Sequence, residues 1–136
     1  MTAFKTTLVA ISLGLALGVA QARDEPMYMP ERMSLAGKPE ITQAKLHDAL
    51  VRAGARRNWI VINDVPGELT FKYSRQGKHE ATVKATYDAT GYQLAYVNSY
   101  NLNADPDKQR IHPTYNTWIR NLSNDVAIEV SLIGNK

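Results

Sequence analysis

The chain has 136 residues, no cysteine and a formal net charge of +3 at pH 7, from 16 basic and 13 acidic side chains. The absence of cysteine excludes disulfide bonds, cysteine-ligated metal sites, a cysteine nucleophile and a lipid anchor attached through cysteine. The charge surplus is too small to indicate nucleic-acid binding, and the length fits one domain that folds without cross-links.

The first 22 residues have the features of a secretory signal peptide. Lys5 precedes the 13-residue apolar run LVAISLGLALGVA, which is shorter than the roughly 20 residues that a membrane-spanning helix needs. The triplet Ala20-Gln21-Ala22 is of the small-x-small kind that signal peptidase cleaves. We therefore expect a periplasmic protein that is cleaved after Ala22, does not span the membrane and does not meet nucleic acid.

Residues 23–40 hold three of the six prolines and show almost no periodicity. This composition predicts an extended, flexible leader. A single domain over residues 41–136 should follow it.

A helix is predicted over residues 42–57. Thr42 can cap its first turn, and the apolar residues that follow keep one helical face: Leu46, Ala49, Leu50 and Ala53. Gly54 is an unusual residue for a helix interior.

From Trp59 the hydrophobic period changes to two, which predicts four short strands joined by turns at Pro66-Gly67, Gln76-Gly77 and Thr90-Gly91. Four such strands form an antiparallel meander with one buried and one solvated face. Four residues fall on the solvated face of the second and third strands: Thr70, Lys72, Thr82 and Lys84. Glu68 and Glu80 share their parity and are expected to pair with the lysines across the strands.

Residues 114–132 are predicted to form a second helix. Pro113 suits a first helical turn, and one continuous apolar face follows at Tyr115, Trp118, Ile119, Leu122 and Val126. The predicted fold is therefore a single α+β domain of order α-β-β-β-β-α, in which two helices pack on one face of a four-stranded sheet. Its predicted core consists of Leu46, Leu50, Trp59, Val61, Leu69, Phe71, Val83, Leu94, Tyr115, Trp118, Ile119 and Leu122.

The segments YDATGYQLAYVNSYNL and IHPTYNTWIRNL, together with Trp59, carry a resemblance. Over roughly residues 41–125 the chain resembles a group of small, uncharacterised exported proteobacterial proteins, some of them lipoproteins. It departs from the lipoprotein members because it lacks an anchoring cysteine. The resemblance implies the compartment and the fold, and it implies no catalytic residues.

Three candidate sites for a binding partner stand out. Arg52 and Arg56 are four residues apart and share a helical face, where they suit an anionic envelope component or a solvated helix end. The open sheet face with Thr70, Lys72, Thr82 and Lys84 can dock a protein, including by strand addition, although any one-sided sheet exposes such a face. His112, next to Pro113, is expected to cap the second helix or to bond to the preceding loop.

Met27, Met29 and Met33 offer thioethers, which are ligands suited to Cu(I). The sequence contains no GxSxG and no HExxH motif, and the strand acids Glu68 and Glu80 have the parity of the solvated face. We therefore expect a non-enzymatic protein, without a cofactor, that binds another cell-envelope component, and we expect this component to be a protein. The alternative is a Cu(I)-binding or carrier protein that uses these three methionines.

Overall fold

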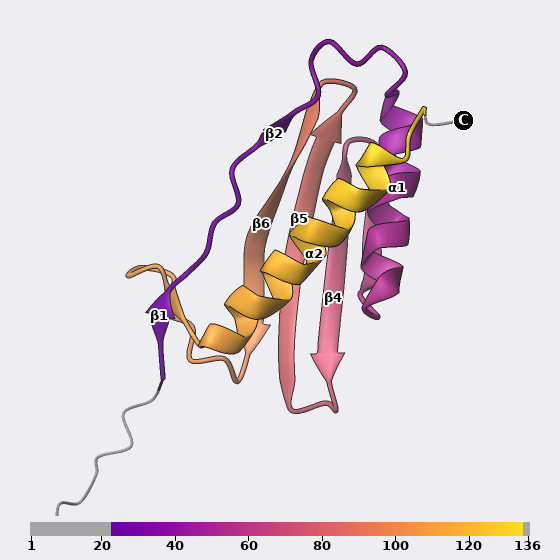
Figure 1. Ribbon diagram of the computed structural model, residues 1–136. Coiled ribbons are helices and arrows are strands. Elements are labelled where there is room, and N and C mark those ends of the chain that lie inside the picture. The colour runs from indigo at the N-terminus through magenta and orange to yellow at the C-terminus, as the bar shows by residue number, and fades with distance from the viewer. Residues whose placement is uncertain (1–22, 135–136) are drawn as a thin grey trace, which may run out of the picture.

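The computed structural model describes residues 23–134, and the predicted signal peptide lies outside them. Their elements, in chain order, are β1 (Glu25–Pro26), β2 (Met33–Ser34), α1 (Gln43–Arg56), β3 (Ile60–Val65), β4 (Glu68–Arg75), β5 (His79–Asp88), β6 (Gly91–Tyr100), β7 (Arg110–Ile111) and α2 (Pro113–Ser131) (Figure 1). The α+β class and the two helices are as predicted.

The main sheet is antiparallel and has the strand order β2-β6-β5-β4-β3. The predicted meander supplies four of these strands. The prediction of a four-stranded sheet is wrong, because Met33 and Ser34 of the leader pair with Tyr92 and Gly91 at the edge of β6. Two short strands therefore precede α1, and the helix is not the first element. A two-residue strand has no detectable hydrophobic period, so the sequence pattern did not reveal it.

The leader is docked on the domain, which corrects the prediction of a flexible segment separate from it. Met27 and Leu35 are 8% and 6% exposed and belong to the core. Backbone hydrogen bonds fix both residues, from Met27 N to Gln109 O at 2.7 Å and from Leu35 N to Thr90 O at 2.7 Å. β1 also pairs with β7 in a separate two-stranded sheet. The leader is extended, as its prolines predict, and hydrogen bonds at separate points along it hold it on the domain.

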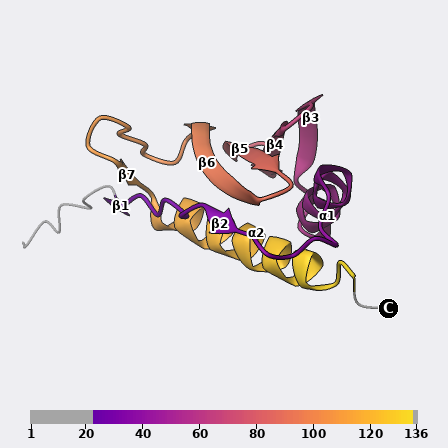
Figure 2. The same ribbon diagram turned by 90° about the horizontal axis from the view of Figure 1, so that it is seen from above.

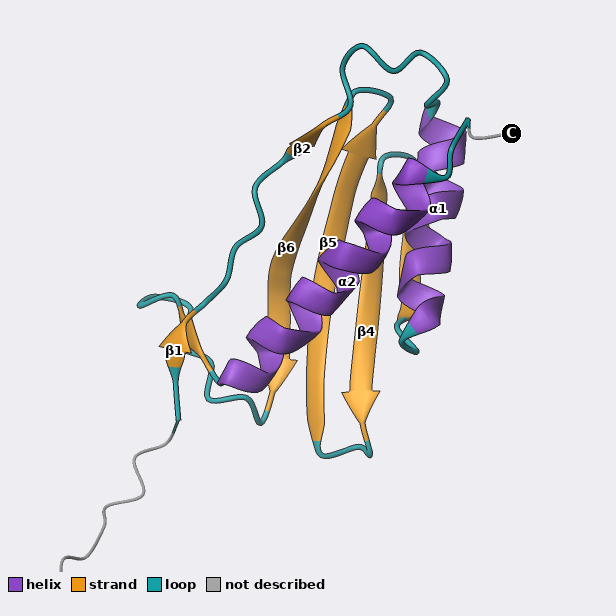
Figure 3. Ribbon diagram, in the orientation of Figure 1, coloured by secondary structure: helices purple, strands orange, loops and turns teal. Residues whose placement is uncertain are grey.

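Both helices cover the same face of the main sheet, with α2 crossing the sheet obliquely and α1 lying near β3 (Figures 2 and 3). Each predicted core residue is buried there, except Val61 and Trp118, which are partly buried and pack against the core. Three aromatic rings close one side of it: the centroid of Tyr73 lies 5.4 Å from Trp59 and 4.7 Å from Trp118. Neither of the two helices in residues 23–134 covers the opposite face of the sheet (Figure 2).

Two features define the open edge of the sheet. Among the described strands, β3 is the last in the order and pairs only with β4. A bulge between Val61 and Asn63 leaves Ile62 without a partner residue in β4.

Candidate functional site

The open face of β4 and β5 brings together the four residues predicted there. Thr70 stands opposite Lys84, and Lys72 stands opposite Thr82. The lysines form the expected cross-strand ion pairs: Lys72 Nζ lies 3.2 Å from a carboxylate oxygen of Glu80, and Lys84 Nζ lies 3.2 Å from one of Glu68. The centre of this face is therefore balanced in charge.

Thr70 and Thr82 are only 9% and 7% exposed. The prediction that their side chains are solvated is wrong, because each stands directly opposite a lysine whose aliphatic stem can cover it. These hydroxyls offer little to a partner. Their part in binding remains a prediction, as does that of the two lysines.

Arg52 and Arg56 join the two helices. The Nε of Arg52 donates to Glu129 Oε2 at 3.0 Å, and the Nη2 of Arg56 donates to Glu129 Oε1 at 2.7 Å. The Glu129 side chain is 8% exposed, whereas the two arginine side chains are about half exposed. Hydrogen bonds from Arg52 and then Arg56 lower the pKa of Glu129 below its usual value.

The sequence predicts that these arginines meet either an anionic envelope component or solvent. It did not reveal Glu129 as their partner, because this acid lies 73 residues beyond Arg56. An anionic envelope component would have to compete with Glu129 for both side chains, and this role also remains a prediction.

The β3 edge is a feature that the sequence reasoning missed. Ile60, Ile62 and Val65 are 67%, 54% and 43% exposed. Ile60 is paired with Lys72 and Val65 with Glu68, so both lie on the open face of the sheet. The exposed apolar side chains therefore follow a strand whose outer backbone groups have no neighbouring strand in the structure.

His47 links α1 to this edge. Its Nδ1 lies 2.9 Å from Asp48 Oδ1 and its Nε2 lies 2.8 Å from Asp64 Oδ2, at the end of β3. Hydrogen bonds to Asp48 and then to Asp64 raise the pKa of His47. The protonated ring donates to both carboxylates and so helps hold β3 against the helix. Only Asp48, adjacent in sequence, could have suggested this cluster.

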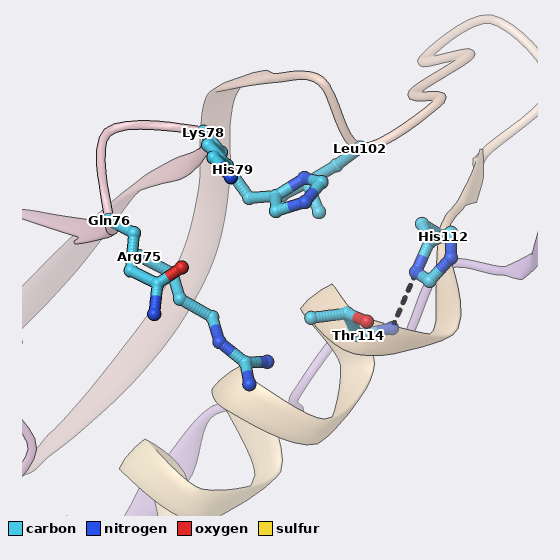
Figure 4. Close-up of a pocket in the computed structure, with 7 residues that line it drawn as sticks. All are labelled: Arg75, Gln76, Lys78, His79, Leu102, His112 and Thr114. Carbon is cyan, nitrogen blue, oxygen red and sulfur yellow. Dashed lines mark hydrogen bonds between the residues drawn. The ribbon is translucent and has the colours of Figure 1, made fainter.

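His112 caps α2, one of the two roles expected for it. Its Nδ1 accepts a hydrogen bond from Thr114 N at 3.1 Å, and its own backbone N donates to Leu102 O at 2.8 Å. The ring also borders a cavity with Arg75 and His79 (Figure 4). The cap satisfies a donor of the first helical turn that would otherwise lack a partner.

The leader methionines have unlike surroundings. Met27 is buried in the core, whereas Met29 and Met33 are 56% and 49% exposed. Met29 borders one cavity with Met27 and another with Met33. Nothing in this arrangement favours a three-thioether Cu(I) site. Within residues 23–134, no group of three or more histidine, aspartate or glutamate side chains is placed to hold a metal ion.

Comparisons with known proteins give no family assignment. No protein-family model matches the chain, and no curated protein or solved structure is significantly similar to it. Neither helix in the described part of the chain combines the length and apolar character that a membrane crossing requires.

Proposed function

We propose that the protein is a non-enzymatic periplasmic protein that binds another protein of the cell envelope by accepting an extended segment of it at the β3 edge. The observation that carries this proposal is the combination of an unpaired strand side with three exposed apolar residues, Ile60, Ile62 and Val65. A free strand edge presents N–H and C=O groups that can pair with an incoming strand.

The side chains along the edge indicate which segment would fit. Ile60 and Val65 lie on the open face, so apolar residues at alternate positions of an added strand would cover them. Such a segment would bury apolar area at about 25 cal/mol per Å² in addition to forming backbone hydrogen bonds. The bulge at Ile62 twists the strand locally and limits uncontrolled sheet extension, as edge bulges do.

The charge beside the edge gives a second criterion for the partner segment. The side chains of Asp48 and Asp64 are 66% and 48% exposed, and the single histidine between them offsets only one of the two carboxylates. A basic residue in the partner segment, on the side nearer α1, would therefore be favoured. The preferred partner is an extended segment with alternating apolar residues and a lysine or arginine.

The test is affinity purification of envelope proteins on immobilised protein, followed by hydrogen exchange of the complex. Ile62→Lys places a charge on the edge, and we expect it to weaken partner binding by about tenfold or more. Ile128→Lys is the matched control, because Ile128 is an isoleucine of α2, is 47% exposed and does not belong to β3. In the complex, amide exchange should slow in residues 60–65.

Two results would overturn this proposal. One is equal binding by the Ile62→Lys and Ile128→Lys variants. The other is a homodimer of the purified protein, measured by sedimentation, whose formation protects the same amides and occupies the edge.

A further inference from the structure

A cavity of about 290 Å³ lies where the β4–β5 turn meets the start of α2, away from β3. Its lining residues come from the turn, from the loop after β6 and from the first residues of α2: Arg75, Gln76, Lys78, His79, Leu102, His112 and Thr114. Figure 4 shows the His79 and His112 rings on opposite sides of this space, with the Arg75 side chain extending toward the first turns of α2. No carboxylate is among the lining residues.

Within residues 23–134, no carboxylate forms an ion pair with the basic residues that line this cavity. Five arginines of the described chain form ion pairs with carboxylates, namely Arg32, Arg52, Arg56, Arg57 and Arg110. Arg120 instead lies over the ring of Tyr28, at 4.5 Å. Arg75 and Lys78 have no such partner among the residues described. The fold therefore leaves two basic residues without an ion pair among those that line one concave site.

Hydrogen bonds fix the two imidazoles with one nitrogen available on each. His79 Nδ1 donates to the carbonyl of Asn101 at 2.9 Å, which leaves Nε2 for another contact. His112 Nδ1 accepts from Thr114 N, so in the neutral ring the proton is on Nε2. In the neutral ring of His79, Nε2 is an acceptor, so the donors that the cavity can present to one ligand are the His112 Nε2–H, a guanidinium, an ammonium and the Thr114 hydroxyl.

We infer that this cavity binds a phosphate group. A phosphate monoester carries a charge of about −1.5 to −2 and three terminal oxygens, which matches two formal positive charges and donors from several directions. A carboxylate has only two oxygens and one charge, so it would leave part of this donor set unused. The guanidinium of Arg75 suits a bidentate contact with phosphate oxygens. This inference is independent of the β3 edge.

The phosphate could belong to a soluble phosphate monoester or to a lipid that carries a terminal phosphate monoester, and both share the recognised chemistry. The cavity is open to solvent, so either source can reach it.

The experiment is titration of the purified protein with inorganic phosphate at constant ionic strength, followed by NMR of the His79 and His112 imidazoles. We expect saturable shifts with a Kd of about 1 mM or lower. The double variant Arg75→Gln/Lys78→Gln should weaken binding about tenfold or more, because charge-assisted hydrogen bonds are lost. Lys38→Gln/Lys108→Gln is the matched control: it removes two positive charges that form none of the described ion pairs and do not line the cavity.

Unsaturated shifts up to about 50 mM phosphate, well above the affinity range expected for a specific site, would overturn the inference. Equal weakening in both double variants would also overturn it, since diffuse attraction by net charge would then explain the binding. Vesicles that contain phosphatidic acid, a lipid with a terminal phosphate monoester, distinguish the sources: binding that requires Arg75 and Lys78 assigns a lipid headgroup. Phosphate binding without vesicle binding assigns a soluble phosphate compound.

Discussion

Glu129 is a buried carboxylate that holds two arginines of the neighbouring helix. It is the third residue from the end of α2, yet its side chain is only 8% exposed and contacts both Arg52 and Arg56. Half-exposed arginines lose part of their interaction energy to solvent screening. The pairs therefore contribute modestly to stability, and they fix how α1 lies against α2.

Glu129→Gln should lower the free energy of unfolding at pH 7 by about 1–2 kcal/mol, because two charge-assisted hydrogen bonds become weaker. The pKa of Glu129 is lowered in the folded protein. Its contribution is therefore complete above the unfolded-state value of about 4.3 and is lost as the pH falls below it. Urea unfolding between pH 3 and 7 checks this.

The matched control is Glu31→Gln, which removes an exposed carboxylate that forms none of the described ion pairs. The stability difference between wild type and Glu129→Gln should shrink below about pH 4. A difference that stays constant across this range would contradict the assignment.

Gly54 lies inside α1, although glycine has a low helix propensity. A Cβ atom at this position would lie 2.7 Å from Cε1 and 3.0 Å from Cδ1 of Phe71, a fully buried side chain of β4. Real carbon atoms do not approach so closely. The glycine therefore allows the last turn of α1 to contact the sheet.

Gly54→Ala should destabilise the protein by roughly 1–3 kcal/mol through overpacking, in spite of the gain of about 1 kcal/mol that alanine brings to a helix. Thermal or denaturant unfolding measures the change. In a Phe71→Leu background the penalty should become smaller, since the ring that the Cβ meets is gone. An unchanged penalty in that background would show that the backbone, rather than Phe71, requires the glycine.

Elements with a regular hydrophobic period could be predicted from the sequence, and those without it could not. The apolar face of α2 and the alternation in β4 and β5 are strong patterns, and the structure confirms them. The docked leader has no period because isolated residues such as Met27 and Leu35 anchor it. The sequence also did not reveal that Ile60 and Ile62 are exposed. A short apolar run predicts burial, and only the strand order shows that this run lies at the edge of the sheet.

At the scale of the whole molecule, candidate sites depend on contacts between distant residues. The acidic partners of Lys72 and Lys84 could be predicted from strand parity, and the fold confirms them. The shared partner of Arg52 and Arg56 could not, because Glu129 lies on the distant α2. The fold leaves two other regions available for binding: the apolar β3 edge and the basic cavity at the start of α2. Both regions become visible only when the strand order and the helix position are known.

If β3 receives a partner strand, a probe on this strand should contact the partner. The measurement is photo-crosslinking in the host envelope with a photoreactive residue at Ile62, compared with the same residue at Ile128, followed by mass spectrometry. We expect a saturable crosslink from position 62 to an extended segment of one envelope protein, and none from position 128. The absence of a crosslink at position 62, or the same crosslinked proteins from both positions, would contradict strand addition at β3.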